Sequence, residues 1–198
     1  RRLILGCVMV FFYFPILYML IFSFNGSRSL TSFDGFSLQW YHKMFNDRNM
    51  MEAIYYTLVT AVVATFVSTI VGTITAIGLS KSRRIVREVV QQINDLPIMN
   101  PEIVTAVGLM LFYVSLHMEK GFLTMLAHIA FCTPYVILSV MPKLRGLDPN
   151  LAEAAMDLGA RPTQAMWKVI VPQIMPGVVS GALIAFTMSF DDFIISYF

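Results

Sequence analysis

The sequence predicts an all-α membrane protein, and three observations lead to this prediction. Of the 198 residues, 57% are hydrophobic and only 13% are charged, whereas soluble globular domains carry roughly 25% charged residues. The mean hydropathy is +0.70. The apolar residues gather in long segments, as membrane-spanning helices of about 20 residues require. A net charge of +2, with no basic tract interleaved with aromatic residues, argues against a nucleic-acid-binding protein.

Five segments are predicted to span the membrane, at residues 3–24, 53–79, 103–118, 122–141 and 174–198. The first contains Pro15, where we expect a kink. The second is rich in Gly, Ala and Thr, whose small side chains let helix backbones approach closely, so we expect it to pack inside a helix bundle. The third is shorter than a span requires unless it includes residues that precede it.

The Lys and Arg residues are distributed unequally between the two sets of linkers. Ten of the 14 lie before the first span or in the linkers around residues 81–91 and 142–172, and four lie in the other linkers. Because cytoplasmic loops carry an excess of Lys and Arg, the N-terminus and these two linkers are predicted to be cytoplasmic. The linker 25–52 is then external, and its aromatic residues suit either the membrane interface or a docking surface for an external partner.

The cytoplasmic linker at about 143–172 predicts two short helices joined at a glycine. Asp148 followed by Pro149 indicates a helix start, because an aspartate caps a helix and proline suits its first position. Gly159 indicates the end of this helix in the left-handed conformation. Pro162 indicates the start of a second short helix, and Pro172 marks the entry to the last span. Such a linker suits either an interfacial loop or a rigid elbow that docks into another protein.

The same linker resembles the EAA loop of ABC-importer permeases, whose pattern is E-A-A, three residues, G, nine residues and I-x-L-P. The matching positions here are Glu153, Ala154, Ala155, Gly159, Val169, Val171 and Pro172. Valine therefore replaces both the isoleucine and the leucine of the pattern. In the family this loop forms the coupling helix that docks into the ATPase subunit. The resemblance implies this coupling role for six residues: Glu153, Ala154, Ala155, Asp157, Gly159 and Pro172.

The stretches FNGSR, MNPEIV and SFDDFIIS extend the resemblance, over nearly the whole chain, to the permeases of spermidine/putrescine importers. This implies a type I ABC importer (MetI-like) transmembrane domain over residues 1–198, with a sixth span expected beyond Phe198. It also implies a multi-pass protein of the inner membrane that moves polyamines by alternating access. The implied partners are a homologous permease, two ATPase subunits that hold ATP and Mg, an external polyamine-binding protein and membrane lipid.

Two adjacent carboxylates, Asp191 and Asp192, follow a long apolar run. A bare charge at membrane depth costs about 3 kcal/mol or more, so water, a cation or a partner chain should compensate it. If the segment is helical, the two side chains differ by about 100° around the axis and cannot point at one spot. They are candidates for the path of a cationic substrate, and the alternative is a solvated or capping pair at the outer interface.

Three further residues are candidates for the substrate path. Asp95 and Glu102 lie around Pro97 and Pro101, which disfavour a continuous helix. Broken backbone at membrane depth is tolerated where it meets protein or water, so this stretch either lines the path or leads into the third span. Tyr135 offers an aromatic face for a cation–π contact with an ammonium group, but a place in the helix core or at the membrane interface is the more ordinary role for such a residue.

The sequence contains none of the common motifs for catalysis, metal binding or phosphate binding, and its three His residues are far apart along the chain. We therefore predict no catalytic residue, no metal and no cofactor in this chain, with energy supplied by the ATPase partner. The alternatives are a permease for another small solute, a passive channel and an intramembrane enzyme.

Overall fold

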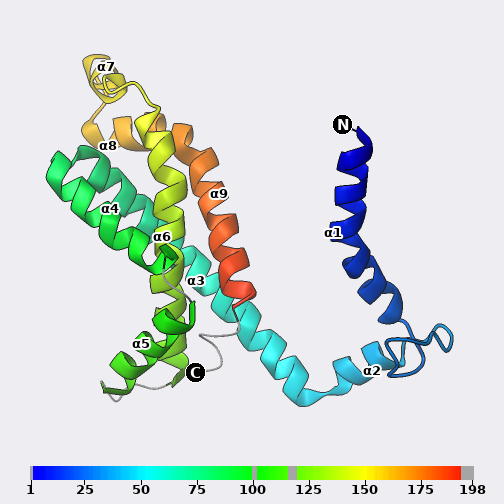
Figure 1. Cartoon of the computed structure of the whole chain (residues 1–198). Helices are drawn as coiled ribbons and strands as arrows, with labels where there is room; N and C mark the ends of the chain where they lie inside the picture. Colours follow the sequence, from blue (N-terminus) through cyan, green and yellow to red (C-terminus); the bar gives the residue numbers. More distant parts are fainter. Residues whose placement is uncertain (1, 100–101, 116–119, 193–198) are drawn as a thin grey trace. The chain divides into compact units, whose positions relative to one another are not determined.

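A computed structural model describes residues 2–99, 102–115 and 120–192 of this chain (Figure 1). These residues are helical apart from connecting segments and one isolated bridge between Asn25 and Phe36. The chain divides into two compact units, Arg1–Tyr56 and Thr57–Phe198. Within the described residues, four helices are long and apolar enough to cross a membrane: Ile4–Phe22, Arg48–Lys81, Gly121–Arg145 and Pro162–Phe190. The all-α membrane fold predicted from composition is therefore confirmed.

The first unit consists of helix α1 (Arg2–Phe22), a polar and aromatic loop, α2 (Gln39–Asn46) and the start of α3 (Arg48–Lys81). The candidate span in α1 buries none of its residues, so its apolar surface is available to lipid or to another chain. Pro15 lies inside α1, and the helix continues through it. Pro15 has no N–H to donate to the preceding turn, and the loss of this one hydrogen bond does not end the helix.

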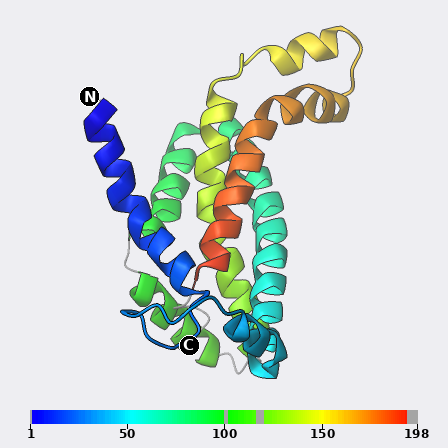
Figure 2. The ribbon, with the colours of Figure 1, turned by 90° about the vertical axis from the view of Figure 1, so that its right-hand side faces the viewer.

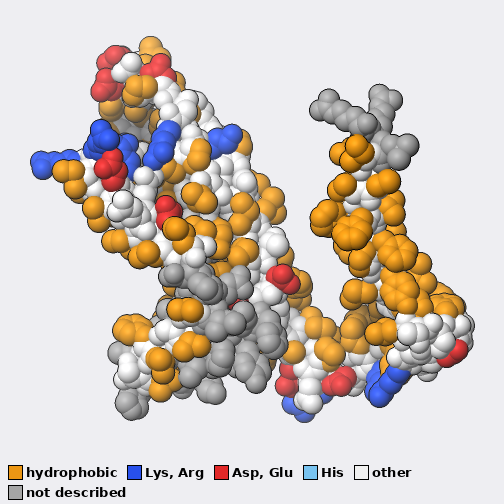
Figure 3. Space-filling view, viewed as in Figure 1, with side chains coloured by type: hydrophobic (Ala, Val, Ile, Leu, Met, Phe, Trp, Pro, Cys, Tyr) orange, Lys and Arg blue, Asp and Glu red, His pale blue; other side chains and the backbone are white. Residues whose placement is uncertain are grey.

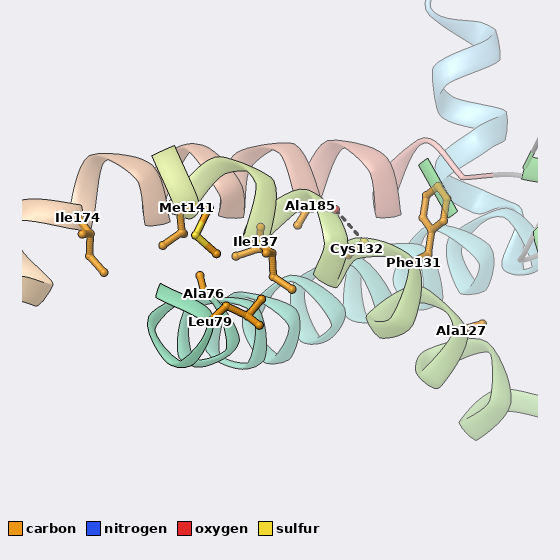
Figure 4. Close-up of a cluster of buried hydrophobic side chains, with 11 residues drawn as sticks. Ala76, Leu79, Ala127, Phe131, Cys132, Ile137, Met141, Ile174 and Ala185 are labelled. Carbon is orange, nitrogen blue, oxygen red and sulfur yellow. Dashed lines mark hydrogen bonds between the residues drawn. The ribbon is translucent and has the colours of Figure 1, made fainter. Parts of the chain in front are cut away.

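The second unit is built around α6 (Lys120–Arg145), which runs between α4 (Arg84–Met99) and α9 (Val171–Phe190) in both ribbon views (Figures 1 and 2). The remainder of α3 also packs against α6. Figure 4 shows the apolar side chains between these helices. The core consists of Ala76, Leu79, Ala127, Phe131, Cys132, Val136, Ile137, Val140, Met141, Ile174 and Ala185.

Small residues set the close approach of the helices in this core. The buried positions of α3 recur every three or four residues, at Ala61, Ala64, Ser68, Gly72, Ala76 and Leu79. A Cβ atom built on Gly72 would lie 2.8 Å from the Cβ of Val136 in α6, well inside van der Waals contact. One built on Gly181 of α9 would lie 3.1 Å from the Val136 Cα. The prediction that the second span packs inside a bundle is confirmed at Gly72 and Ala76.

Three predicted segments differ from the helices observed. The predicted span 103–118 corresponds to α5 (Glu102–Ser115), whose 14 residues are fewer than a span requires; residues 116–118 lie outside the described part of the chain. Helix α4 continues through Pro97 to Met99, because a proline in the last turn leaves most of the helix hydrogen bonds intact. Helix α9 ends at Phe190, so the prediction of a helix through Asp191 and Asp192 is wrong.

Candidate functional site

The first candidate site is the elbow formed by α7 (Leu151–Asp157) and α8 (Pro162–Ala165). Gly159 has a φ of +88°, which is the left-handed conformation predicted for the end of the first helix. The Ala160 N–H donates to the Ala155 carbonyl over 3.1 Å, and the Gly159 N–H donates to the Met156 carbonyl over 2.8 Å. These two bonds make a Schellman motif, which satisfies the last carbonyls of α7 and turns the chain sharply.

The start of this helix was wrongly predicted. Helix α7 begins at Leu151, with Asn150 as the residue that precedes it, so Asp148 and Pro149 lie outside the helix. The Asp148 carboxylate instead accepts the Asn150 N–H over 2.9 Å in a tight local turn. Aspartate side chains form such turns as readily as they cap helices, and this competition moved the start by two residues.

The second arm of the elbow leads directly into a membrane span. Pro162 begins α8 as predicted, and the Gln164 side chain accepts the Arg161 N–H over 3.0 Å. A π-helical turn at Met166–Ile170 then connects α8 to α9, and the chain changes direction across it (Figures 1 and 2). Pro172 occupies the first turn of α9, where its missing N–H costs no helix hydrogen bond. The stretch from Pro162 to Phe190 is therefore helical throughout, with a bend at the π-helical turn.

The elbow presents both charged and apolar side chains to its surroundings. Glu153, Ala154 and Asp157 are exposed on α7, whereas Ala155 is half-buried. Leu158 retains 91% of its surface and Trp167 retains 70%, so both offer apolar area at the elbow. In the second unit, Lys and Arg side chains gather at the end that carries α7 and α8 (Figure 3).

The second candidate site lies where α9 ends, and the structure separates its two carboxylates. Asp191 is exposed, and its N–H still donates to the Thr187 carbonyl over 3.0 Å as the last bond of the helix. Asp192 turns inward, and its side chain retains only 3% of its surface. One carboxylate is therefore accessible to a ligand, and the other is held inside the protein.

His128 of α6 is the buried neighbour of Asp192, and its importance was missed in the sequence. Its Nε2 lies 3.7 Å from Asp192 Oδ2, and its Nδ1 lies 2.8 Å from the Ser189 Oγ. The three residues bridge α6 to the last turn of α9 and the second residue after that helix. A His inside an apolar run was itself a signal, because polar residues in membrane spans usually face the bundle interior and find partners there.

These three residue types also occur in serine hydrolases, which relates the cluster to the predicted alternative of an intramembrane enzyme. A nucleophilic hydroxyl must reach a substrate carbonyl. Ser189 and His128 retain only 2% and 1% of their surface, so a substrate has no direct approach to either group. The geometry suits a polar contact that holds two helices together, as interhelical hydrogen bonds do in membrane bundles.

Asp95 occupies a different place, between α4 and α6. It lines a pocket of about 230 Å³ together with Gln91, Asn94 and Arg145. Arg145 donates to the Gln91 amide oxygen over 3.1 Å, so its guanidinium is held beside this pocket. Arg145 places a positive charge at this pocket, which would repel a cationic ligand, so Asp95 is a weaker candidate than Asp191 for binding an ammonium group.

The remaining substrate-path candidates are less informative. Glu102 is the first residue of α5, and its side chain is outside the described part of the structure. Tyr135 is half-buried in α6, with its ring edge-to-face against Phe131 at 5.6 Å between centroids. The described residues hold no cluster of metal-ligating side chains.

Comparison with known proteins identifies relatives over the whole chain. A family model described as "Binding-protein-dependent transport system inner membrane component" matches residues 68–198. The spermidine/putrescine transport system permease protein PotC of Haemophilus influenzae is 37% identical, over 100% of this chain and 77% of the relative. The putrescine transport system permease protein PotI of Escherichia coli is 38% identical, over 100% of this chain and 73% of the relative. PotC of Escherichia coli is 34% identical, over 96% of this chain and 73% of the relative.

Proposed function

This chain belongs to the family of inner-membrane components of binding-protein-dependent transport systems, and from this premise we propose that it is the permease subunit of an ATP-driven polyamine importer. Such a subunit works in a complex with other subunits. We propose as partners a homologous permease, two ATPase subunits that hold ATP and Mg, and an external polyamine-binding protein. The N-terminus and the elbow are proposed to be cytoplasmic, because Lys and Arg are concentrated on that side.

The observation that carries this proposal is the geometry of the elbow. Two short helices are joined rigidly at the left-handed Gly159, and the second continues without a break into a membrane span. Exposed Leu158 and Trp167 offer apolar area to a partner, while Glu153 offers a charge-assisted hydrogen bond. When the ATPase subunits move, the elbow would transmit the displacement to α9 and its neighbours, and the substrate path would open alternately to the two sides of the membrane.

The position of Asp191 supports a cationic cargo. It caps the C-terminus of α9, where the helix dipole is already negative. A carboxylate is unfavourable at this end of a helix, so a bound cation would stabilise it there. The exposed carboxylate and the helix end together make a region of negative potential that would attract the ammonium groups of a polyamine.

Asp192 and His128 are proposed to have a different role, as a brace between α6 and the end of α9. The 2.8 Å contact between His128 and Ser189, together with the approach of Asp192, holds the turn that carries Asp191. The two carboxylates should therefore respond differently to neutral substitution. Asp191→Asn should change uptake, whereas Asp192→Asn should change the stability of the assembled transporter as well.

We expect Asp191→Asn to lower ATP-dependent uptake of labelled spermidine by about tenfold, because the loss of ~1.4 kcal/mol of attraction corresponds to that factor. Uptake is measured in sealed vesicles that hold the full complex, with assembly checked by size-exclusion chromatography. Asp34→Asn is the matched control, since it removes one exposed carboxylate from the loop after α1. Normal uptake by Asp191→Asn would contradict the role of this carboxylate, and would direct attention to Glu102 and Asp95.

Inhibition of spermidine uptake by another class of solute, and not by unlabelled putrescine, would contradict the polyamine cargo itself.

A further inference from the structure

The loop that follows α1 is a preformed structure. Asn25 is fully buried, and its side-chain amide donates to the carbonyls of Ser29 and Ser32 over 2.9 and 2.8 Å. Its carbonyl side-chain oxygen accepts the Asp34 N–H, and its backbone carbonyl accepts the indole N–H of Trp40 over 2.9 Å. One buried residue thus holds the loop through its side chain and α2 through its backbone carbonyl, so the surface that they form is fixed before any ligand arrives.

This surface contains a pocket of about 570 Å³ at the end of α1. Its lining includes Phe22, Ser23, Arg28, Leu30, Trp40 and Met44. Arg28 lies over the Trp40 ring at 5.4 Å from the ring centroid, and Lys43 lies over the same ring at 5.9 Å. Within the described part of the chain, neither cation has a carboxylate partner within ion-pair distance. The pocket therefore combines apolar walls with an uncompensated positive charge.

The length of α1 indicates where the pocket lies relative to the membrane. The apolar stretch Ile4–Phe22 has 19 residues, which at 1.5 Å each correspond to ~28 Å, close to the ~30 Å thickness of the hydrocarbon core. The pocket starts at Phe22 and Ser23, where this stretch ends. It therefore lies at the level of the lipid headgroups, whichever side of the membrane the loop occupies.

We propose that this pocket binds the headgroup of an anionic phospholipid. The Arg28 guanidinium has the geometry and the weak hydration that suit a phosphate group. Leu30 is 70% exposed at the pocket and, with Phe22 and Met44, offers apolar contact to the first methylenes of the acyl chains. The continuous apolar surface of α1 then accompanies those chains into the bilayer. Because Arg28 and Lys43 would repel a cationic cargo, this site is separate from the proposed path of the substrate.

The test uses the assembled transporter in lipid nanodiscs that contain phosphatidylglycerol or phosphatidylcholine with the same photoreactive group in the headgroup. After illumination, labelled peptides are identified by mass spectrometry. We expect the peptides that cover residues 22–44 to be labelled at least fivefold more by phosphatidylglycerol than by phosphatidylcholine. Arg28→Gln should remove this preference, while ATP hydrolysis by the complex remains normal. Arg48→Gln is the matched control, since it removes one cation that pairs with Glu52 outside the pocket, and should retain the preference.

Three results would overturn the proposal. The first is equal labelling by the two lipids, and the second is an unchanged preference in Arg28→Gln. The third is loss of labelling on addition of millimolar inorganic phosphate, which would assign the pocket to a soluble anion. Loss of labelling only when the external binding protein is added would support the lipid site and indicate that the two compete for the same face.

Discussion

Replacing Gly72 by valine is expected to destabilise the packing of α3 against α6 by about 1–3 kcal/mol, the usual cost of overfilling a core. The new Cβ would lie 2.8 Å from two carbons of the Val136 side chain and 3.2 Å from the Thr133 carbonyl oxygen. Carbon atoms pack favourably at about 3.5–4.0 Å, so the helices must separate. The neighbouring core would then lose contacts along α6.

The matched control for this change is Gly78→Val in the same helix, because a Cβ at Gly78 meets nothing within 4 Å. Both substitutions remove a flexible glycine from a helix interior, so helix propensity affects them alike. The thermal stability of the purified complex, followed by size-exclusion chromatography after heating, should fall for Gly72→Val and stay near wild type for Gly78→Val. Equal stability of the two variants would contradict the close contact of α3 with α6.

Replacing Gly159 by valine is expected to lower transport by at least about tenfold while leaving the assembled complex in the membrane. A side chain in the left-handed region costs about 1–2 kcal/mol, and more for a β-branched residue. Relief of this strain would unwind the last turn of α7 and break the bond from the Gly159 N–H to the Met156 carbonyl. The elbow would lose its rigid angle, and the movement of the ATPase would no longer reach α9.

The informative comparison for this position is Gly159→Asn, because asparagine tolerates the left-handed conformation. No atom lies within 4 Å of a Cβ at Gly159, so both side chains have room. ATP hydrolysis and spermidine uptake are measured on the same vesicles. We expect Gly159→Val to hydrolyse ATP with little uptake, and Gly159→Asn to recover most of the uptake. Full uptake by Gly159→Val would contradict the mechanical role of the elbow.

The helical fold could be predicted from the sequence because its determinants are local. Long apolar runs set the spans, and a glycine followed by a proline three residues later set the turn between α7 and α8. Where two local structures compete, the prediction was less accurate. The side chain of Asp148 can cap a helix or close its own turn, and only the structure distinguishes the two outcomes.

The arrangement at the end of α9 could not be predicted, because it depends on residues far apart in the sequence. His128 and Ser189 are 61 positions apart, and they meet only when α6 packs against α9. The sequence predicted that Asp191 and Asp192 point in different directions, but it did not predict which of the two would be buried. Packing makes them different, since the helix ends just before them and one turns inward toward His128 while the other remains exposed.

The measurement that most directly tests the central claim is the uptake of labelled spermidine by the complete complex in sealed vesicles, with and without ATP. The account predicts concentrative uptake that requires both ATP and the external binding protein, and that unlabelled putrescine inhibits. Equilibration of spermidine without ATP would indicate a passive channel. A complex that hydrolyses ATP in response to its binding protein but accumulates no polyamine would contradict the proposed cargo.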